Sequence, residues 1–272
     1  MNDDLAKLIG FIDAGGLSRR SFLTRSAAFG ATAVLAGTAM GSKASAAEPK
    51  RGGILKMGLG GGETTDTLDP ALALNNVTFS INRQWGDTIV NVTADGKIEP
   101  RLAESFEANA DATVWTFKIR EGVKFQDGTP MTADDVVATY KRHSDDNAKS
   151  GAQGIMKGLK EIKADGGNVV ITTDGGNADL PYLLSDYHLV IQPKGGVDNP
   201  TAAIGTGAYK VKTAELGVRY EFEKNADDWD QNRGYYDGVE IIVINDSTAR
   251  NSALQSGQVH MINKVDPKVA KL

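Results

Sequence analysis

The sequence predicts a mixed α/β fold of the α+β type. Three observations lead to this prediction: strands that alternate between apolar and polar residues, as in Val114–Arg120, a helix with a clear start at Thr132, and β-prone segments that recur late in the chain, such as Val239–Ile244. The composition, with 40% hydrophobic and 24% charged residues, is that of an ordinary globular protein.

The first 46 residues are predicted to form a twin-arginine signal peptide. The pair Arg19-Arg20 is followed by Phe22-Leu23, by a weakly apolar run over residues 27–40, and by Ala44-Ser45-Ala46, which has the A-x-A form of a cleavage site. The alternative is that the two arginines are solvated charges on an ordinary helix, but the order of these features favours export. We expect cleavage after Ala46 or Ala47. The apolar run is too short for a membrane span, which needs about 20 residues.

A predicted strand and a glycine-rich loop come next. Gly52–Gly58 reads as the strand, and the loop from Gly60 to Pro70 holds three consecutive glycines followed by Glu63-Thr64-Thr65-Asp66. Proline fixes its own φ and biases the preceding residue toward an extended conformation, so we interpret Asp69-Pro70 as structural. A helix over residues 79–89 should follow, with Trp85 in the core.

The middle of the chain predicts hairpins and one well-capped helix. Residues 91–98 form a hairpin signal that turns at Asp95-Gly96, and residues 114–120 form a strand that buries every second side chain. After a turn at residues 127–130, Thr132 is the predicted helix N-cap. Acidic residues in the first turn favour a helix that runs to about Arg142.

The last part of the chain is predicted to rejoin the part of the fold that contains the first strand. We expect the chain to come back at Ile204–Val211, then to form strands at Tyr220–Glu223 and Val239–Ile244, a helix capped by Ser247 and running through Gln255, and a short strand at Val259–Ile262. Residues 47–75 and 200–272 are therefore predicted to form one lobe, into which residues 76–199 are inserted as a β-rich subdomain. Trp229 is expected to pack the lobe rather than to hold a ligand.

Several functional classes are disfavoured. Residues 1–46 hold 5 basic and 3 acidic residues, so the rest of the chain carries 25 basic against 32 acidic residues, a net charge of −7 without the basic patch of a nucleic-acid binder. There is no cysteine, and the three histidines lack metal-ligand spacing. The glycine run lacks the third glycine of the dinucleotide-binding motif, and the acidic run from Asp228 has one residue too many for a calcium loop. We expect no cofactor and no metal.

The chain resembles the extracytoplasmic solute-binding proteins of the peptide and nickel class, which are the binding components of ABC importers. The resemblance covers nearly all of the chain after the signal peptide. It is carried by these segments: Leu68-Asp69-Pro70, Ile98-Glu99-Pro100-Arg101-Leu102-Ala103-Glu104-Ser105, Trp115-Thr116-Phe117, Arg120-Glu121-Gly122-Val123-Lys124-Phe125, Asp127-Gly128-Thr129-Pro130, Thr132-Ala133-Asp134-Asp135-Val136, Gly205-Thr206-Gly207-Ala208-Tyr209, Tyr235-Tyr236-Asp237-Gly238 and Ala253-Leu254-Gln255-Ser256-Gly257.

The resemblance implies a fold and a role. The fold is a lobe like that of type II periplasmic binding proteins, with the second lobe, which supplies most ligand contacts in the relatives, missing here. The role is that of a monomeric periplasmic protein that captures a peptide or similar small solute and passes it to an inner-membrane ABC permease. Since there is no cysteine, there is no lipid-anchoring site of the kind that Gram-positive relatives use.

The resemblance also points to a binding site in the glycine-rich loop. Glu63 or Asp66 is expected to meet a ligand amine or backbone group, and Thr64 and Thr65 are expected to supply hydrogen bonds. The alternative is a solvated loop. For the whole protein, the alternatives are a secreted carbohydrate-active hydrolase, which would need two carboxylates at a defined separation, and a fragment that binds nothing.

Overall fold

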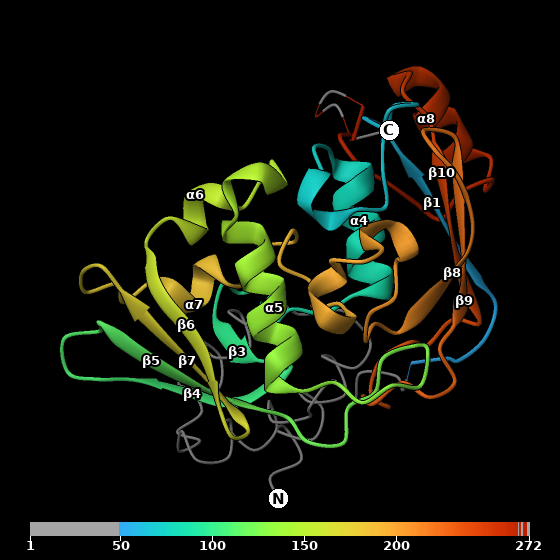
Figure 1. Cartoon of the computed structure of the whole chain (residues 1–272). Helices are drawn as coiled ribbons and strands as arrows, with labels where there is room; N and C mark the ends of the chain where they lie inside the picture. Colours follow the sequence, from blue (N-terminus) through green and yellow to red (C-terminus); the bar gives the residue numbers. More distant parts are fainter. Residues whose placement is uncertain (1–48, 266, 268, 271–272) are drawn as a thin grey trace, which may run out of the picture. The chain divides into compact units, whose positions relative to one another are not determined.

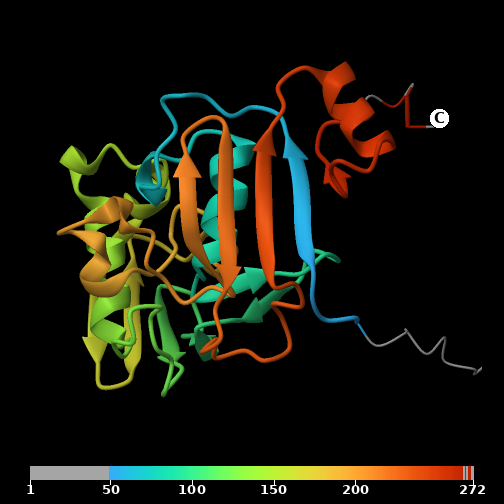
Figure 2. The ribbon, with the colours of Figure 1, turned by 90° about the vertical axis from the view of Figure 1, so that its right-hand side faces the viewer.

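A five-stranded mixed sheet joins the first and last described strands of the chain (Figures 1 and 2). The computed structural model describes residues 49–265, 267, 269 and 270, and from Arg51 onward they form one compact unit. The predicted signal peptide, residues 1–46, lies outside the described residues. The strand order is β11-β1-β10-β9-β8, with these bounds: β1 Ile54–Leu59, β8 Tyr209–Glu215, β9 Arg219–Lys224, β10 Gly238–Val243 and β11 Met261–Ile262.

The direction of these strands determines where their ends meet. β1 is parallel to β10 and to β11, whereas β9 is antiparallel to both β10 and β8. The carboxyl ends of β1 and β10 therefore lie at the same edge of the sheet, which Figure 2 shows at the top. The strands predicted around Ile54, Tyr220 and Val239 are confirmed.

Helix α4, Asn76–Trp85, lies behind this sheet (Figure 2). The prediction of a helix over residues 79–89 is wrong at both ends. Asn75 caps the start by accepting hydrogen bonds from the main-chain N–H groups of Val77 and Thr78 at 2.9 and 3.2 Å. The helix ends before Gly86, where a Cβ atom would lie 2.8 Å from Val190. The expected burial of Trp85 is confirmed, since its exposed fraction is 0%.

A four-stranded antiparallel sheet forms the other part of the unit, in the order β4-β5-β7-β6. On β5 the side chains of Trp115, Phe117 and Ile119 are buried, as the alternation predicted. The predicted hairpin at residues 91–98 is present as β2 and β3, which turn at Gly96 with φ of +79°. The bounds are β2 Val90–Val92, β3 Ile98–Pro100, β4 Ala103–Ala108, β5 Val114–Ile119, β6 Leu159–Asp165 and β7 Asn168–Thr173.

Helix α5, Ala133–Ser144, lies over the four-stranded sheet (Figure 1). Its start at Thr132 is confirmed, and Thr132 forms a reciprocal capping box with Asp135. The Thr132 hydroxyl and main-chain N–H both donate to the Asp135 carboxylate, at 2.9 and 2.8 Å. Asp135 also accepts from the main-chain N–H of Lys194 at 2.8 Å, so it fastens a distant segment to the helix start.

The remaining helices are short. Helix α8 is capped by Asp246, which accepts from the main-chain N–H of Ala249 at 2.7 Å, so the prediction of Ser247 as the cap is wrong by one residue. Within the described residues, no helix is both long and apolar enough to cross a membrane. The bounds are α6 Gln153–Met156, α7 Leu180–Leu183 and α8 Ser247–Gln255, with 3-10 turns at Pro70–Leu72, Asp146–Ala148, Pro193–Gly196 and Pro200–Ala202.

The buried apolar side chains form two clusters. One lies between α5 and the four-stranded sheet, and the other lies between α4 and the five-stranded sheet. Val77, Ile81 and Trp85 of α4 belong to the second cluster. The division into a lobe and an inserted subdomain at residues 76–199 stays a prediction, and the packing of α4 argues for moving its first boundary to about Gly86.

Candidate functional site

The glycine-rich loop leaves β1 at the carboxyl edge of the five-stranded sheet. It starts at Gly60, directly after Leu59, and runs along the same edge at which β10 ends (Figure 2). The last main-chain bond of this strand pair runs from the Ile244 N–H to the Leu59 carbonyl at 2.8 Å. Ligands of open α/β sheets bind outside the carboxyl ends of parallel strands, so the loop occupies the expected place for a site.

Two asparagine side chains hold the loop where main-chain pairing stops. Asn263, just after β11, accepts from the Gly60 N–H at 2.8 Å and donates to the Gly60 carbonyl at 3.1 Å. Asn245, just after β10, accepts from the Gly61 N–H at 2.8 Å and donates to the Gly62 carbonyl at 3.0 Å. Gly61 has a φ of +109°, a value that side chains other than glycine rarely allow. The loop is thus fixed from both sides.

Arg250 of α8 lies buried beneath the loop. Its guanidinium donates to the main-chain carbonyls of Ile244, Asn245, Asn263 and Lys264, at distances from 2.7 to 3.4 Å. Its exposed fraction is 4%. The Arg250 guanidinium therefore joins the segment after β10 to the segment after β11. Each of these segments contains one of the two asparagines that bind the loop.

The β8–β9 turn supports the next part of the loop. Gly217 lies so close to Glu63 that a Cβ atom there would be 2.4 Å from the Glu63 carbonyl. The Gly217 N–H donates to the Tyr220 hydroxyl at 2.8 Å. Burial raises the pKa of Tyr220 above its ordinary value, and the neighbouring Asp66 carboxylate adds to the rise. The Tyr220 hydroxyl therefore fixes the turn that lies beside the loop.

The four predicted ligand residues divide into two groups. Glu63, Thr64 and Thr65 are exposed, whereas Asp66 is buried with an exposed fraction of 9%. One oxygen of Asp66 accepts from the Glu63 N–H at 3.0 Å, and the other accepts from the Asn75 side chain at 2.6 Å. Both oxygens of Asp66 are thus used within the protein, while the Glu63 carboxylate faces outward with only a 3.4 Å contact from the Thr65 hydroxyl.

The end of the loop is tied to the four-stranded part. Asp69, with an exposed fraction of 7%, accepts from one guanidinium nitrogen of Arg142 at 2.7 and 2.6 Å and from the Ala71 N–H at 2.9 Å. This geometry agrees with the structural interpretation of Asp69-Pro70. The loop is therefore anchored at both ends, with Glu63 to Thr65 at its exposed middle.

The family comparison covers most of the chain. Residues 97–272 match the profile of the bacterial extracellular solute-binding proteins, family 5 Middle. The chain belongs to this family. Members of family 5 are extracytoplasmic binding proteins, and the mixed α/β fold agrees with theirs.

Known relatives of this family 5 chain include proteins with different ligands. The oligopeptide-binding protein AppA of Bacillus subtilis is 29% identical over 239 residues, which is 82% of this chain and 42% of AppA. The structure of AppA with a nonapeptide has a TM-score of 0.68 at 25% identity and covers 78% of this chain and 44% of that chain. The structure of AgaA from A. tumefaciens R10 with agropinic acid has a TM-score of 0.70 at 30% identity. The match covers 76% of this chain and 43% of the AgaA chain.

This family 5 chain thus spans less than half the length of the relatives it matches. The relatives are binding proteins rather than enzymes, and the hydrolase alternative gains no support from them. In the described part of the chain, no group of three His, Cys, Asp or Glu side chains is arranged to hold a metal ion.

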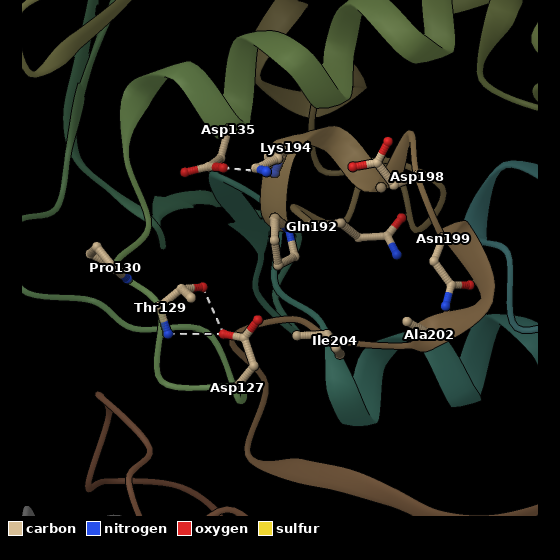
Figure 3. A pocket seen from close by; sticks show the side chains of 12 residues that line it. Asp127, Thr129, Pro130, Asp135, Gln192, Lys194, Asp198, Asn199, Ala202 and Ile204 are labelled. Carbon is tan, nitrogen blue, oxygen red and sulfur yellow. Dashed lines mark hydrogen bonds between the residues drawn. The ribbon is translucent and has the colours of Figure 1, made fainter.

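A concavity of this family 5 chain lies away from the loop, at the start of α5 (Figure 3). Its volume is about 400 Å³, and it contains none of the four predicted ligand residues. Figure 3 shows two hydrogen-bonded groups on its wall, Thr129 with Asp127 and Lys194 with Asp135. It is lined by Asp127, Thr129, Pro130, Asp135, Gln192, Pro193, Lys194, Gly196, Asp198, Asn199, Ala202 and Ile204.

Trp229 packs against the core of the four-stranded part, as expected. The guanidinium groups of Arg101, Arg120 and Arg233 lie 4.7, 5.0 and 5.3 Å from the centre of its ring. Both oxygens of Asp228 accept from Arg233 at 2.8 Å. The acidic run that begins like a calcium loop is therefore engaged with an arginine.

The residues that hold the loop were not predicted from the sequence. Asn245, Asn263, Gly217 and Arg250 were not predicted to take part in a site. A signal was present for the two asparagines, because each directly follows a predicted strand, and the carboxyl ends of neighbouring parallel strands meet at one edge. The contributions of Gly217 and Arg250 depend on long-range packing that no local pattern encodes.

Proposed function

We propose that this chain is part of the substrate-binding component of an ABC importer, which captures a peptide or a similar small solute outside the cytoplasmic membrane and delivers it to a membrane permease. The observation that carries the proposal is the anchored loop at the carboxyl edge of the parallel strands, which presents Glu63, Thr64 and Thr65 to solvent. Family membership supports the same function, because the relatives bind oligopeptides or agropinic acid.

Each loop residue has a separate proposed role. The Glu63 carboxylate would accept hydrogen bonds from an ammonium or amide N–H group of the ligand, and the hydroxyl and main-chain groups of Thr64 and Thr65 would orient it. Asp66 would act indirectly, since its oxygens already hold Glu63 and Asn75. This division supports Glu63, rather than Asp66, as the proposed ligand contact.

The mechanism we propose is reversible capture. A small-molecule cleft buries about 70–90% of its ligand, and a single loop face covers only one side of it. Closure of a second lobe over the ligand would supply the rest, and the closed form would dock on the permease. The described residues alone should therefore bind ligand weakly, with a Kd in the millimolar range, which corresponds to about −4 kcal/mol.

We also propose a route and a location. Residues 1–46, with their arginine pair, would direct the chain through the twin-arginine pathway to the periplasm, where it would act as a monomer.

An NMR titration tests the proposed function at this affinity. The uniformly ¹⁵N-labelled chain is titrated with tripeptides and longer peptides, and with a disaccharide of similar size as a control. We expect saturable shifts at the amides of residues 60–66 and 216–218 for peptides but not for the sugar. Saturable shifts confined to the recess at the start of α5, or none with any peptide, would contradict the proposal.

A further inference from the structure

We propose that Asn245 and Asn263 are positioning residues that preorganise the ligand-facing loop; this inference rests on the function proposed above. Beyond Leu59, where main-chain pairing of β1 with β10 and β11 ends, the two side chains supply the hydrogen bonds that neighbouring strands would otherwise make. They contact the loop but not the ligand. Their effect on binding would be to keep Gly60 to Gly62 in one conformation.

The hydrogen bonds show how each side chain replaces a strand. A carboxamide carries one acceptor and a donor, as a peptide group does. Asn263 pairs with both main-chain groups of Gly60, and Asn245 pairs with the Gly61 N–H and the Gly62 carbonyl. The loop therefore keeps partners on both sides beyond Leu59, although Gly61 has left the extended strand conformation.

Three consecutive glycines make this support necessary. Glycine loses more conformational freedom on ordering than any other residue, so ordering three of them in a row carries a large entropic cost. If the loop became ordered only on binding, that cost would reduce the affinity for the ligand. Because the two asparagines order the loop during folding, the free energy of ligand contact at Glu63 is not spent on ordering Gly60 to Gly62.

Arg250 couples the two asparagines. Its guanidinium donates to the main-chain carbonyls of Asn245 at 3.2 Å and Asn263 at 3.1 Å. A Cβ atom on Gly60 would lie 2.6 Å from an Arg250 nitrogen, so the loop rests directly on this side chain. The two positioning residues are thus held in register by a single buried group.

The test compares Asn245→Ala and Asn263→Ala with a matched control, Asn109→Ala. Asn109 also uses its side chain to hold main-chain groups, accepting from the N–H groups of Thr113 and Val114 at 2.9 Å, but it lies in the β4–β5 turn of the other sheet. For each full-length variant we would measure the thermal midpoint, the amide hydrogen exchange of Gly60 and Gly61, and the Kd for a tripeptide by NMR titration.

We expect the Gly61 amide to exchange at least about tenfold faster in Asn245→Ala, and the Gly60 amide to do so in Asn263→Ala, because each loses its acceptor. Peptide binding should weaken by about twofold to tenfold in both variants. In Asn109→Ala the exchange of both glycines and the Kd should match those of the wild type. If one of the loop variants fails to fold, the other still gives all three measurements.

Two results would overturn the inference in different ways. Unchanged peptide affinity in variants with faster glycine exchange would show that the asparagines hold the loop without positioning it for a ligand, while leaving the proposed function intact. A wild-type chain that shows no saturable peptide shifts would remove the proposed function and the positioning role together.

Discussion

Arg142 of α5 donates to both carboxylate oxygens of Asp69, at 2.7 and 2.6 Å, although the two residues are 73 positions apart in the chain. Their side chains are only 12% and 10% exposed. The pair joins the helix on the four-stranded sheet to the end of the loop that leaves the five-stranded sheet. The pair therefore fixes the end of the candidate ligand-binding loop to the helix that covers the four-stranded sheet.

Removing one partner of this ion pair should destabilise the protein strongly. Asp69→Ala leaves the Arg142 charge buried without its carboxylate, and such losses cost about 3–5 kcal/mol. Urea unfolding measures the change. Glu161→Ala is the control, since Glu161 pairs with Lys163 at 3.4 Å while both side chains are 55% exposed, and it should cost less than about 1 kcal/mol. Equal effects of the two substitutions would show that the Asp69 pair contributes no more than a surface contact.

The contacts at the start of α5 predict which of two substitutions there lowers the free energy of unfolding more. Asp135 accepts hydrogen bonds from Thr132 and from the distant Lys194 N–H, whereas the Thr132 side chain takes part only in the reciprocal capping box with Asp135. Asp135→Ala should therefore lower the free energy of unfolding by about 2 kcal/mol, and Thr132→Ala by about 0.5–1 kcal/mol. Denaturant midpoints test the order. If Thr132→Ala were the more damaging substitution, the assignment of the cap to Asp135 would be wrong.

His143 should make stability depend on pH. Burial, as the largest cause, and the neighbouring Arg142 charge lower the pKa of its imidazole to about 4. The charges of Asp69 and Asp186 raise the pKa of His143, whereas His188, like Arg142, lowers it. The folded protein therefore keeps this ring neutral between pH 6.5 and about 4, while the unfolded chain takes up a proton, so stability falls as the pH drops through this window.

The size of this effect is measurable. Between pH 6.5 and pH 5 the free energy of unfolding should fall by about 2 kcal/mol because of His143. His143→Gln should be less stable at neutral pH but should lack this component of the pH dependence. NMR of the ring provides a direct check, because a His143 ring that becomes protonated near pH 6.5 in the folded protein would contradict the account.

Some elements of the fold are determined by neighbouring residues in the sequence, and others by contacts with distant residues. The strand at Val114 and the start of α5 were predictable because each has its signal within a few residues. The end of α4 was not, since the helix stops where Gly86 packs against Val190, more than a hundred positions away. The outward position of Glu63 and the inward position of Asp66 follow from Asn75 and Gly217, so the short motif alone could not separate their roles.

Export should depend on the arginine pair that precedes the described residues. Changing both Arg19 and Arg20 to lysine should stop translocation and leave the uncleaved precursor in the cytoplasm, because the twin-arginine pathway reads that pair. Cell fractionation followed by immunoblotting measures the outcome. Mature protein in the periplasm at the wild-type yield would argue for another route.

The proposed contact between Glu63 and a ligand N–H group can be measured through the affinity of Glu63→Gln for a tripeptide with a free amino terminus and for its N-acetyl form. We expect the wild type to bind the free amine more tightly, and Glu63→Gln to weaken this binding by about threefold to tenfold and to remove the preference. Glu107→Gln, which changes an exposed carboxylate on β4, should behave as the wild type does. Equal affinities of wild type and Glu63→Gln for the free-amine peptide would contradict the claim.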